Sequence, residues 1–110
     1  MKRLLRFANS AALLLLAVLS TFSAVAEVPQ KAARVYAETL AAYRSGDYAT
    51  AYSGFLMLAR QGNSHAQFYL GYMYDSGKGV VRNYAEAVKW YRRAAEQGDV
   101  DAQFNLGLMY

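Results

Sequence analysis

The sequence has 110 residues, of which twelve are basic, eight are acidic and none is cysteine. This length is enough for one domain, and the lack of cysteine excludes a fold braced by disulfides. Three of the basic residues and none of the acidic ones lie within residues 1–26. The remainder is close to neutral, which excludes a strongly basic surface for nucleic acid or for an anionic membrane.

Residues 1–26 have the pattern of a secretory signal peptide. Three basic residues precede an apolar stretch from Ala11 to Phe22, and Ala24 and Ala26 supply the small residues that a signal peptidase reads. Cleavage would leave a mature chain that begins at Glu27, is periplasmic or secreted, and has no stable membrane insertion. The alternative is an uncleaved anchor, but only 20 residues separate Arg6 from Glu27, which makes a membrane span marginal.

The rest of the chain is predicted to be all helical, because no stretch shows the alternation of a half-buried strand. Helices are expected over residues 31–44, 48–60, about 64–75, 84–96 and from 99 to the last residue. A residue of a type that caps helix N-termini precedes or begins each of the last four predicted helices. These capping residues are Asp47, Asn63 or Ser64, Asn83 and Asp99.

The chain also repeats itself at an offset of 36 residues. Residues 61–74 and 97–110 are identical at nine of fourteen positions, and residues 48–59 share alanines and a tyrosine with residues 84–95. The repeating unit is therefore a pair of helices that cannot bury its apolar surface alone and must stack on its neighbours. Gly71 and Gly107 lie in the middle of predicted helices, where glycine is unfavourable. We expect a neighbouring helix to pass close to each of them.

Two known repeat patterns can be matched to these residues. Leu70-Gly71, Gly77-x-Gly79-Val80, Asn83-Tyr84, Trp90-Tyr91 and Ala94-Ala95-Glu96-Gln97-Gly98 resemble one complete Sel-1-like repeat, and residues 46–55 are more similar to a tetratricopeptide unit. The resemblance implies an all-α solenoid of about two and a half helical hairpins, stacked in a right-handed superhelix. Residues 27–110 would form this domain, with a divergent first unit (31–62), a complete repeat (63–98) and the first helix of a truncated repeat (99–110). We therefore also expect the chain to be a fragment, or to complete its fold with another segment.

No catalytic, metal or cofactor site is expected. The loop Ser76-Gly77-Lys78-Gly79 differs from a phosphate-binding loop in its glycine spacing, in the residue after the lysine and in the helix that precedes it. His65 is the only histidine, so a zinc site or a catalytic triad lacks ligands and partners. Helix capping explains Asp99 and Asp101 better than acid–base catalysis.

A binding surface for a protein or peptide is predicted along the first helix of each unit. Aligning the tetratricopeptide pattern with the three units places aromatic and aliphatic side chains on the inner face of the stack. An exposed row of this kind would hold an extended or helical peptide, although some of these rings could instead be core between adjacent units. The predicted groove consists of Tyr36, Leu40, Tyr43, Phe68, Tyr72, Phe104 and Leu108.

The resemblance implies an adaptor or regulatory scaffold, often in the bacterial envelope. We expect a protein-binding module without catalytic activity. One alternative is a periplasmic regulator that restrains an envelope sensor through the same surface. Another is a β-lactam or cell-wall hydrolase, by analogy with exported relatives, but those are rich in paired cysteines and this chain has none.

Overall fold

The computed structural model describes residues 30–110, so the predicted signal peptide lies outside the described residues. The chain divides into two units, residues 1–33 and residues 34–110. The second unit holds the repeats. None of the helices in the described part of the chain is long and apolar enough to cross a membrane.

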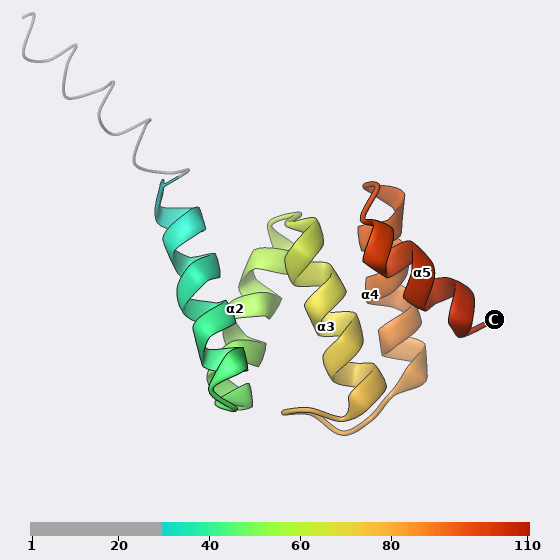
Figure 1. Cartoon of the computed structure of the whole chain (residues 1–110), viewed down its shortest axis with the longest axis horizontal. Helices are drawn as coiled ribbons and strands as arrows, with labels where there is room; N and C mark the ends of the chain where they lie inside the picture. The colour runs from blue at the N-terminus through green and yellow to red at the C-terminus, as the bar shows by residue number, and fades with distance from the viewer. Residues whose placement is uncertain (1–29) are drawn as a thin grey trace, which may run out of the picture. The chain divides into compact units, whose positions relative to one another are not determined.

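The described residues form helices and no strands. A helix over residues 30–44 is followed by α2 (Tyr48–Arg60), α3 (Ser64–Ser76), α4 (Tyr84–Glu96) and α5 (Val100–Leu108). Each helix from α2 on packs against the next along the chain, as Figure 1 shows. The observed bounds agree closely with the predicted ones, except that α5 ends before residue 110. This arrangement confirms an all-α helical repeat solenoid.

The predicted caps are present at the N-termini of α2 to α5. In each case a side-chain oxygen accepts a hydrogen bond from a backbone N–H one turn into the helix, which would otherwise lack a partner. Asn63 rather than Ser64 caps α3, at 2.9 Å from the nitrogen of Ala66. The other caps are Asp47, Asn83 and Asp99.

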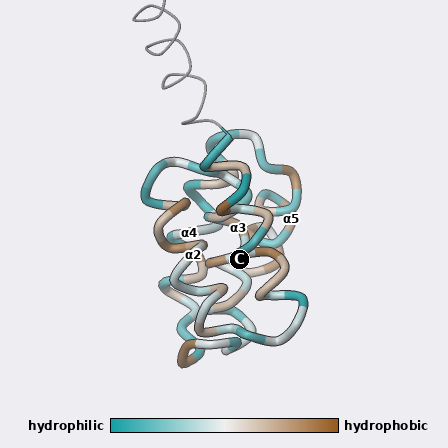
Figure 2. Tube along the Cα trace, turned by 90° about the vertical axis from the view of Figure 1, so that its left-hand side faces the viewer, coloured by the Kyte–Doolittle hydropathy of each residue, from teal (hydrophilic) through white to brown (hydrophobic). Residues whose placement is uncertain are grey.

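Two buried clusters hold the helices together. The first lies around Phe55, Leu70 and Met73 and includes the partly buried aromatic side chains of the helix over residues 30–44. The second lies around Tyr91 and is otherwise lined by buried alanines of α4 and α5. Figure 2 shows the chain trace changing between hydrophobic and hydrophilic colours along the helices, as expected for helices that bury one face.

The close helix contact predicted at Gly71 is confirmed. A Cβ atom at this position would lie 2.5 Å from Cδ1 of Tyr91, whose fully buried side chain belongs to α4. The same expectation was wrong for Gly107, where a Cβ atom would meet no atom within 4 Å among the described residues.

A third helical glycine, Gly54, makes a close contact that the sequence reasoning missed. A Cβ atom there would lie 2.7 Å from Cγ2 of Thr39, which is almost fully buried. The hydroxyl of Thr39 donates to the carbonyl of Val35 at 2.7 Å, so its polar atom is satisfied within its own helix. The repeat offset gave no signal for this contact, because residue 90, at the matching position, is tryptophan.

Candidate functional site

The N-terminal part of the predicted groove is half-buried. Tyr36, Leu40 and Tyr43 pack against the first core cluster rather than standing free. The ring of Tyr43 lies 5.3 Å from that of Tyr69 and 6.1 Å from that of Phe55, both edge to face. Aromatic pairs with this geometry stabilise the fold. These side chains therefore form core between the first and second repeats and present only part of their surface for binding.

The central groove residues are shared in the same way between core and surface. Phe68 and Tyr72 are half-buried and pack against the second core cluster. The ring of Phe68 lies 5.9 Å from that of Tyr91 and 6.5 Å from that of Tyr72. The alternative that some of these side chains are core between adjacent repeats thus applies to five of the seven predicted residues, although each of the five stays partly exposed.

The last two groove residues, both on α5, are the ones most accessible to a partner. Phe104 is 67% exposed and Leu108 is 71% exposed. Phe104 is the counterpart of Phe68, one repeat later. Large apolar side chains that are open to this extent carry much of the energy of a protein interface when a partner covers them.

The loop between α3 and α4 lies against the groove. The ammonium group of Lys78 lies 5.3, 5.7 and 5.8 Å from the ring centroids of Tyr72, Tyr43 and Tyr48, respectively. Burial raises the pKa of the Tyr43 hydroxyl above its ordinary value, so the ring is neutral at physiological pH. The contact is therefore a cation–π interaction with three rings, which the sequence reasoning did not anticipate.

This loop is not built to hold a phosphate. The backbone N–H groups of Gly77 and Lys78 both donate to the carbonyl of Met73, at 2.8 and 3.0 Å, and close the end of α3. Gly77 and Gly79 adopt positive φ angles of 71° and 74°, which glycine reaches without strain. The glycines therefore serve the turn.

Polar contacts at the junctions between hairpins form a second repeated feature. The side-chain amide of Gln67 donates to the carbonyl of Ala59 at 3.1 Å, and Gln103 donates in the same way to Ala95 at 3.2 Å. Both residues of the second pair follow those of the first by 36 positions. The recurrence of glutamine at these two positions is the sequence signal that could have predicted this hydrogen bond between hairpins.

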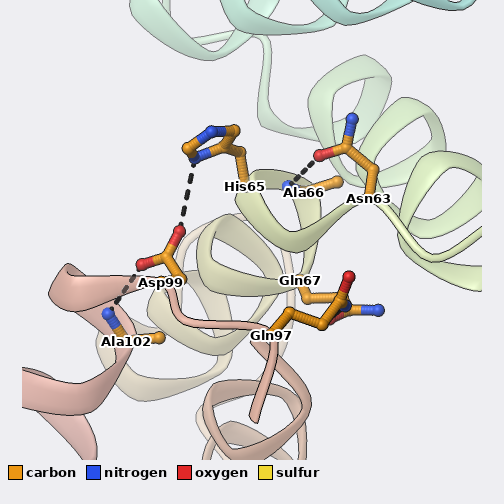
Figure 3. Close-up of polar contacts among 7 residues, drawn as sticks. All are labelled: Asn63, His65, Ala66, Gln67, Gln97, Asp99 and Ala102. Atoms are coloured by element: carbon orange, nitrogen blue, oxygen red, sulfur yellow. Dashed lines mark hydrogen bonds and ion pairs between the residues drawn. The ribbon is translucent and has the colours of Figure 1, made fainter. Parts of the chain in front are cut away.

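His65 stands at the same junction, where Figure 3 shows it pointing from the first turn of α3 toward the cap of α5. Its Nδ1 lies 3.3 Å from Oδ2 of Asp99, and its side chain is 70% exposed. Asp99 also accepts a hydrogen bond from the nitrogen of Ala102, so it acts as the predicted cap. Within the described residues, no group of three or more metal-ligating side chains comes together.

An open pocket of about 850 Å³ lies between the C-terminal half of α3, the start of α4 and the end of α5. The predicted groove residues Tyr72 and Leu108 are part of its wall. Asp75 is the acidic residue that lines it. The other residues in its wall are Tyr84, Ala85, Val88, Asn105 and Met109.

The stacked helical hairpins define a repeat protein of the kind that presents an extended surface to other proteins. The Sel1 repeat model matches residues 64–99 and 100–110. A Sel1 repeat protein from Oxalobacter formigenes is 44% identical over 56% of this chain and 25% of its own, with a TM-score of 0.55. A second solved structure is c5321, a protective antigen present in uropathogenic Escherichia coli strains that displays an SLR fold. It is 41% identical over 57% of this chain and 14% of its own, with a TM-score of 0.57.

Residues 64–110 are therefore Sel1-like repeats. The matched part spans a quarter or less of the length of these two proteins. No curated protein sequence matches the chain. Sel1 repeats generally mediate contacts between proteins, which agrees with the predicted class of function.

Proposed function

We propose that this protein is an exported scaffold of the bacterial envelope that binds a segment of another protein along its groove and has no catalytic activity of its own. The observation that carries this proposal is the row of aromatic and aliphatic side chains along the first helices of the units. The row ends in two strongly exposed residues, Phe104 and Leu108. A peptide that covers them gains the free energy of apolar burial.

The charge and composition of the chain support a protein partner over a charged polymer. Outside residues 1–26 the chain is close to neutral, so long-range attraction to nucleic acid or anionic lipid is weak. The accessible edges of Tyr36 and Tyr72 combine an apolar ring with a hydroxyl, which suits the mixed surface of a peptide. Export rests on the signal-peptide pattern of residues 1–26, with the mature chain beginning at Glu27.

Capture from an envelope extract tests the binding role. The exported chain is tagged at its C-terminus and compared with Phe104→Glu, which places a charge on the proposed surface. Met57→Glu is the matched control, because Met57 is also exposed and apolar but belongs to α2. We expect Phe104→Glu to lose the captured protein and Met57→Glu to keep it. Equal capture by both variants would contradict the proposed surface.

Export and the absence of catalysis are tested on the same material. N-terminal sequencing of the envelope fraction should give Glu27 as the first residue, and a chain that keeps Met1 in the inner membrane would contradict export. A chromogenic β-lactam should be turned over no faster than in a buffer control. Hydrolysis that co-purifies with the chain would support the hydrolase alternative instead.

A further inference from the structure

The loop between α3 and α4 is fixed against the helices that it crosses. Two N–H groups at its start close the end of α3, and at its far end the N–H of Asn83 donates to the carbonyl of Tyr74 at 2.9 Å. Between these points the loop passes close to α2, because a Cβ atom at Gly79 would lie 2.8 Å from Cβ of Tyr48. The backbone that carries Lys78 is therefore held in place.

The side chain of Lys78 is held at the groove as well. Its ammonium group lies between 5.3 and 5.8 Å from the ring centroids of Tyr43, Tyr48 and Tyr72. Tyr43 and Tyr72 are groove residues on two different helices, the helix over residues 30–44 and α3. The three rings restrict the side chain, which stays partly exposed. An ordered cation beside a binding surface loses little conformational entropy when a partner binds it.

The positive charge of Lys78 is not paired with a carboxylate in the described part of the chain. The contact between opposite charges found in residues 30–110 joins His65 to Asp99, and no acidic side chain of this range lies within ion-pair distance of Lys78. Tyrosine rings attract a cation but carry no net charge at neutral pH. A carboxylate at the exposed side of the ammonium group would therefore add both an opposite charge and a charge-assisted hydrogen bond.

The groove surface next to this ammonium group is aromatic. The ring of Phe68 lies 6.5 Å from that of Tyr72, and both side chains are partly exposed. A residue that neighbours a carboxylate bound to Lys78 would therefore lie on these two rings. A large aliphatic or aromatic side chain buries the most apolar area there and gains the most free energy.

We propose that Lys78 determines which segment the groove accepts, by binding the side-chain carboxylate of an aspartate or glutamate that stands next to a large apolar residue. The inference rests on the proposed protein-binding function and names the chemistry of the partner segment. Groove residues on two helices contact the ammonium group, so a bound segment runs past the lysine rather than ending at it. One fixed positive charge on a nearly neutral chain matches a single acidic residue better than a polyanion.

Selection from a displayed library of short random peptides, each fused to carrier protein at both ends, identifies what the purified chain binds. We expect the selected peptides to contain an aspartate or glutamate next to a large apolar residue. Lys78→Met keeps an unbranched apolar side chain over the rings and should lose the acidic preference. Lys78→Glu should select lysine or arginine in its place, a reversal that a merely structural role of Lys78 would not produce.

Lys89→Met is the matched control. This lysine also lies near a ring, 5.8 Å from the centroid of Trp90, but Trp90 belongs to the first core cluster and not to the groove. The control should keep the acidic preference of the unmodified chain. Thermal unfolding checks that all variants remain folded.

One selected peptide is then measured by fluorescence anisotropy. Replacing its acidic residue by the corresponding amide should weaken binding to the unmodified chain about tenfold. The same replacement should leave binding to Lys78→Met unchanged, because the partner of the carboxylate is already gone. Lys78→Arg keeps the charge and should retain the difference between the two peptides.

Several outcomes would overturn the proposal. These are the absence of selected peptides, selection without an acidic preference, the same preference in Lys78→Met, and its loss in Lys89→Met. A preference seen only when the library is displayed with free C-termini would identify a terminal carboxylate as the ligand and overturn it too. Self-association that Lys78→Met abolishes would identify a second copy of the chain as the occupant, with the same consequence.

Failure of this inference is distinguishable from failure of the proposed function. Phe104 belongs to α5 and Lys78 to the loop before α4, so capture from the envelope extract tests the groove independently. If capture depends on Phe104 and persists unchanged in Lys78→Met, only the role of Lys78 is wrong. If capture is equal in Phe104→Glu and its control, the proposed surface itself is wrong.

Discussion

The two helical hairpins of the described unit make their close contacts in opposite ways. In the hairpin formed by the helix over residues 30–44 and α2, the glycine belongs to the second helix, and Thr39 of the first helix lies against it. In the hairpin formed by α3 and α4, the glycine belongs to the first helix, and the ring of Tyr91 lies against it. What persists between repeats is the fit of a side chain against a bare backbone, whereas the helix that carries the glycine changes.

The difference in size between the two opposing side chains has a consequence. Thr39 is small and makes its hydrogen bond within its own helix, whereas Tyr91 is the largest fully buried side chain of the described residues and anchors the second core cluster. A side chain added at Gly71 would therefore displace more surrounding atoms than one added at Gly54. We expect it to be the more sensitive of the two.

Gly71→Leu is expected to have the largest effect on stability. The side chain would collide with the ring of Tyr91, and overpacking of a close contact of this kind costs about 3 kcal/mol. The matched control is Gly107→Leu, its counterpart on α5, where the space is open. That variant should change the free energy of unfolding by no more than about 1 kcal/mol. Chemical denaturation of both variants measures the difference, and similar losses would contradict the role of Gly71 in packing.

Gly54→Ala tests whether the first hairpin follows the same rule. The added methyl group meets the side chain of Thr39, so the variant should lose about 2 kcal/mol. Combining it with Thr39→Ala removes the colliding atoms, and the double variant should recover about 1 kcal/mol relative to the sum of the single changes. A double-mutant cycle by urea denaturation provides the measurement. Strict additivity would show that Gly54 and Thr39 are not coupled.

A third comparison uses the tyrosine hydroxyls of Tyr52 and Tyr74, which hydrogen-bond at 2.8 Å between α2 and α3. Their counterparts one repeat later are Val88 and Tyr110, so the second copy cannot form this bond. The hydrogen bond, followed by burial, raises the pKa of Tyr74 from 10.0 to about 12. This bond contributes stability that is complete below pH 10 and is lost as the pH rises toward 12, because the unfolded chain ionises first.

Tyr52→Phe should therefore cost about 1 kcal/mol at neutral pH and make stability less dependent on pH between 10 and 12. Urea denaturation across this range measures the stability, and absorbance at 295 nm follows the ionisation of tyrosine. Val88→Phe serves as the control, since it changes the counterpart position without removing a hydroxyl. An unchanged pKa of Tyr74 in Tyr52→Phe would contradict the bond between Tyr52 and Tyr74.

His65→Ala should have the smallest effect. The His65 side chain is 70% exposed, so solvent screens its contact with Asp99, whose own side chain is only 4% exposed. Such contacts contribute little, so the expected loss is within about 0.5 kcal/mol. Asp99→Ala at the other side of the same contact should cost about 1 kcal/mol, because it also removes the cap of α5. Thermal unfolding of the two variants should rank them in this order, and the reverse order would assign the stability to His65.

Most of the fold follows from local and repeated patterns of amino acids. Capping residues such as Asn83 and Asp99 mark helix starts through local hydrogen bonds within one turn, so their effect can be read from neighbouring residues. The 36-residue offset identified the repeating hairpin, because identical positions in successive units meet the same surroundings. The contact at Gly71 followed from the cost of a glycine within a helix, which requires a nearby helix to compensate for it.

Which groove residues are core and which are available for binding depends on how the helices pack against one another. Tyr43 and Phe104 belong to the same predicted row, yet one packs against Phe55 and Tyr69 while the other is open to solvent. The contacts of Gly54 and of Lys78 also join residues far apart in the chain, and no local pattern encodes them. Exposure and packing depend on which helices lie next to one another, and that arrangement is a property of the assembled unit rather than of any segment.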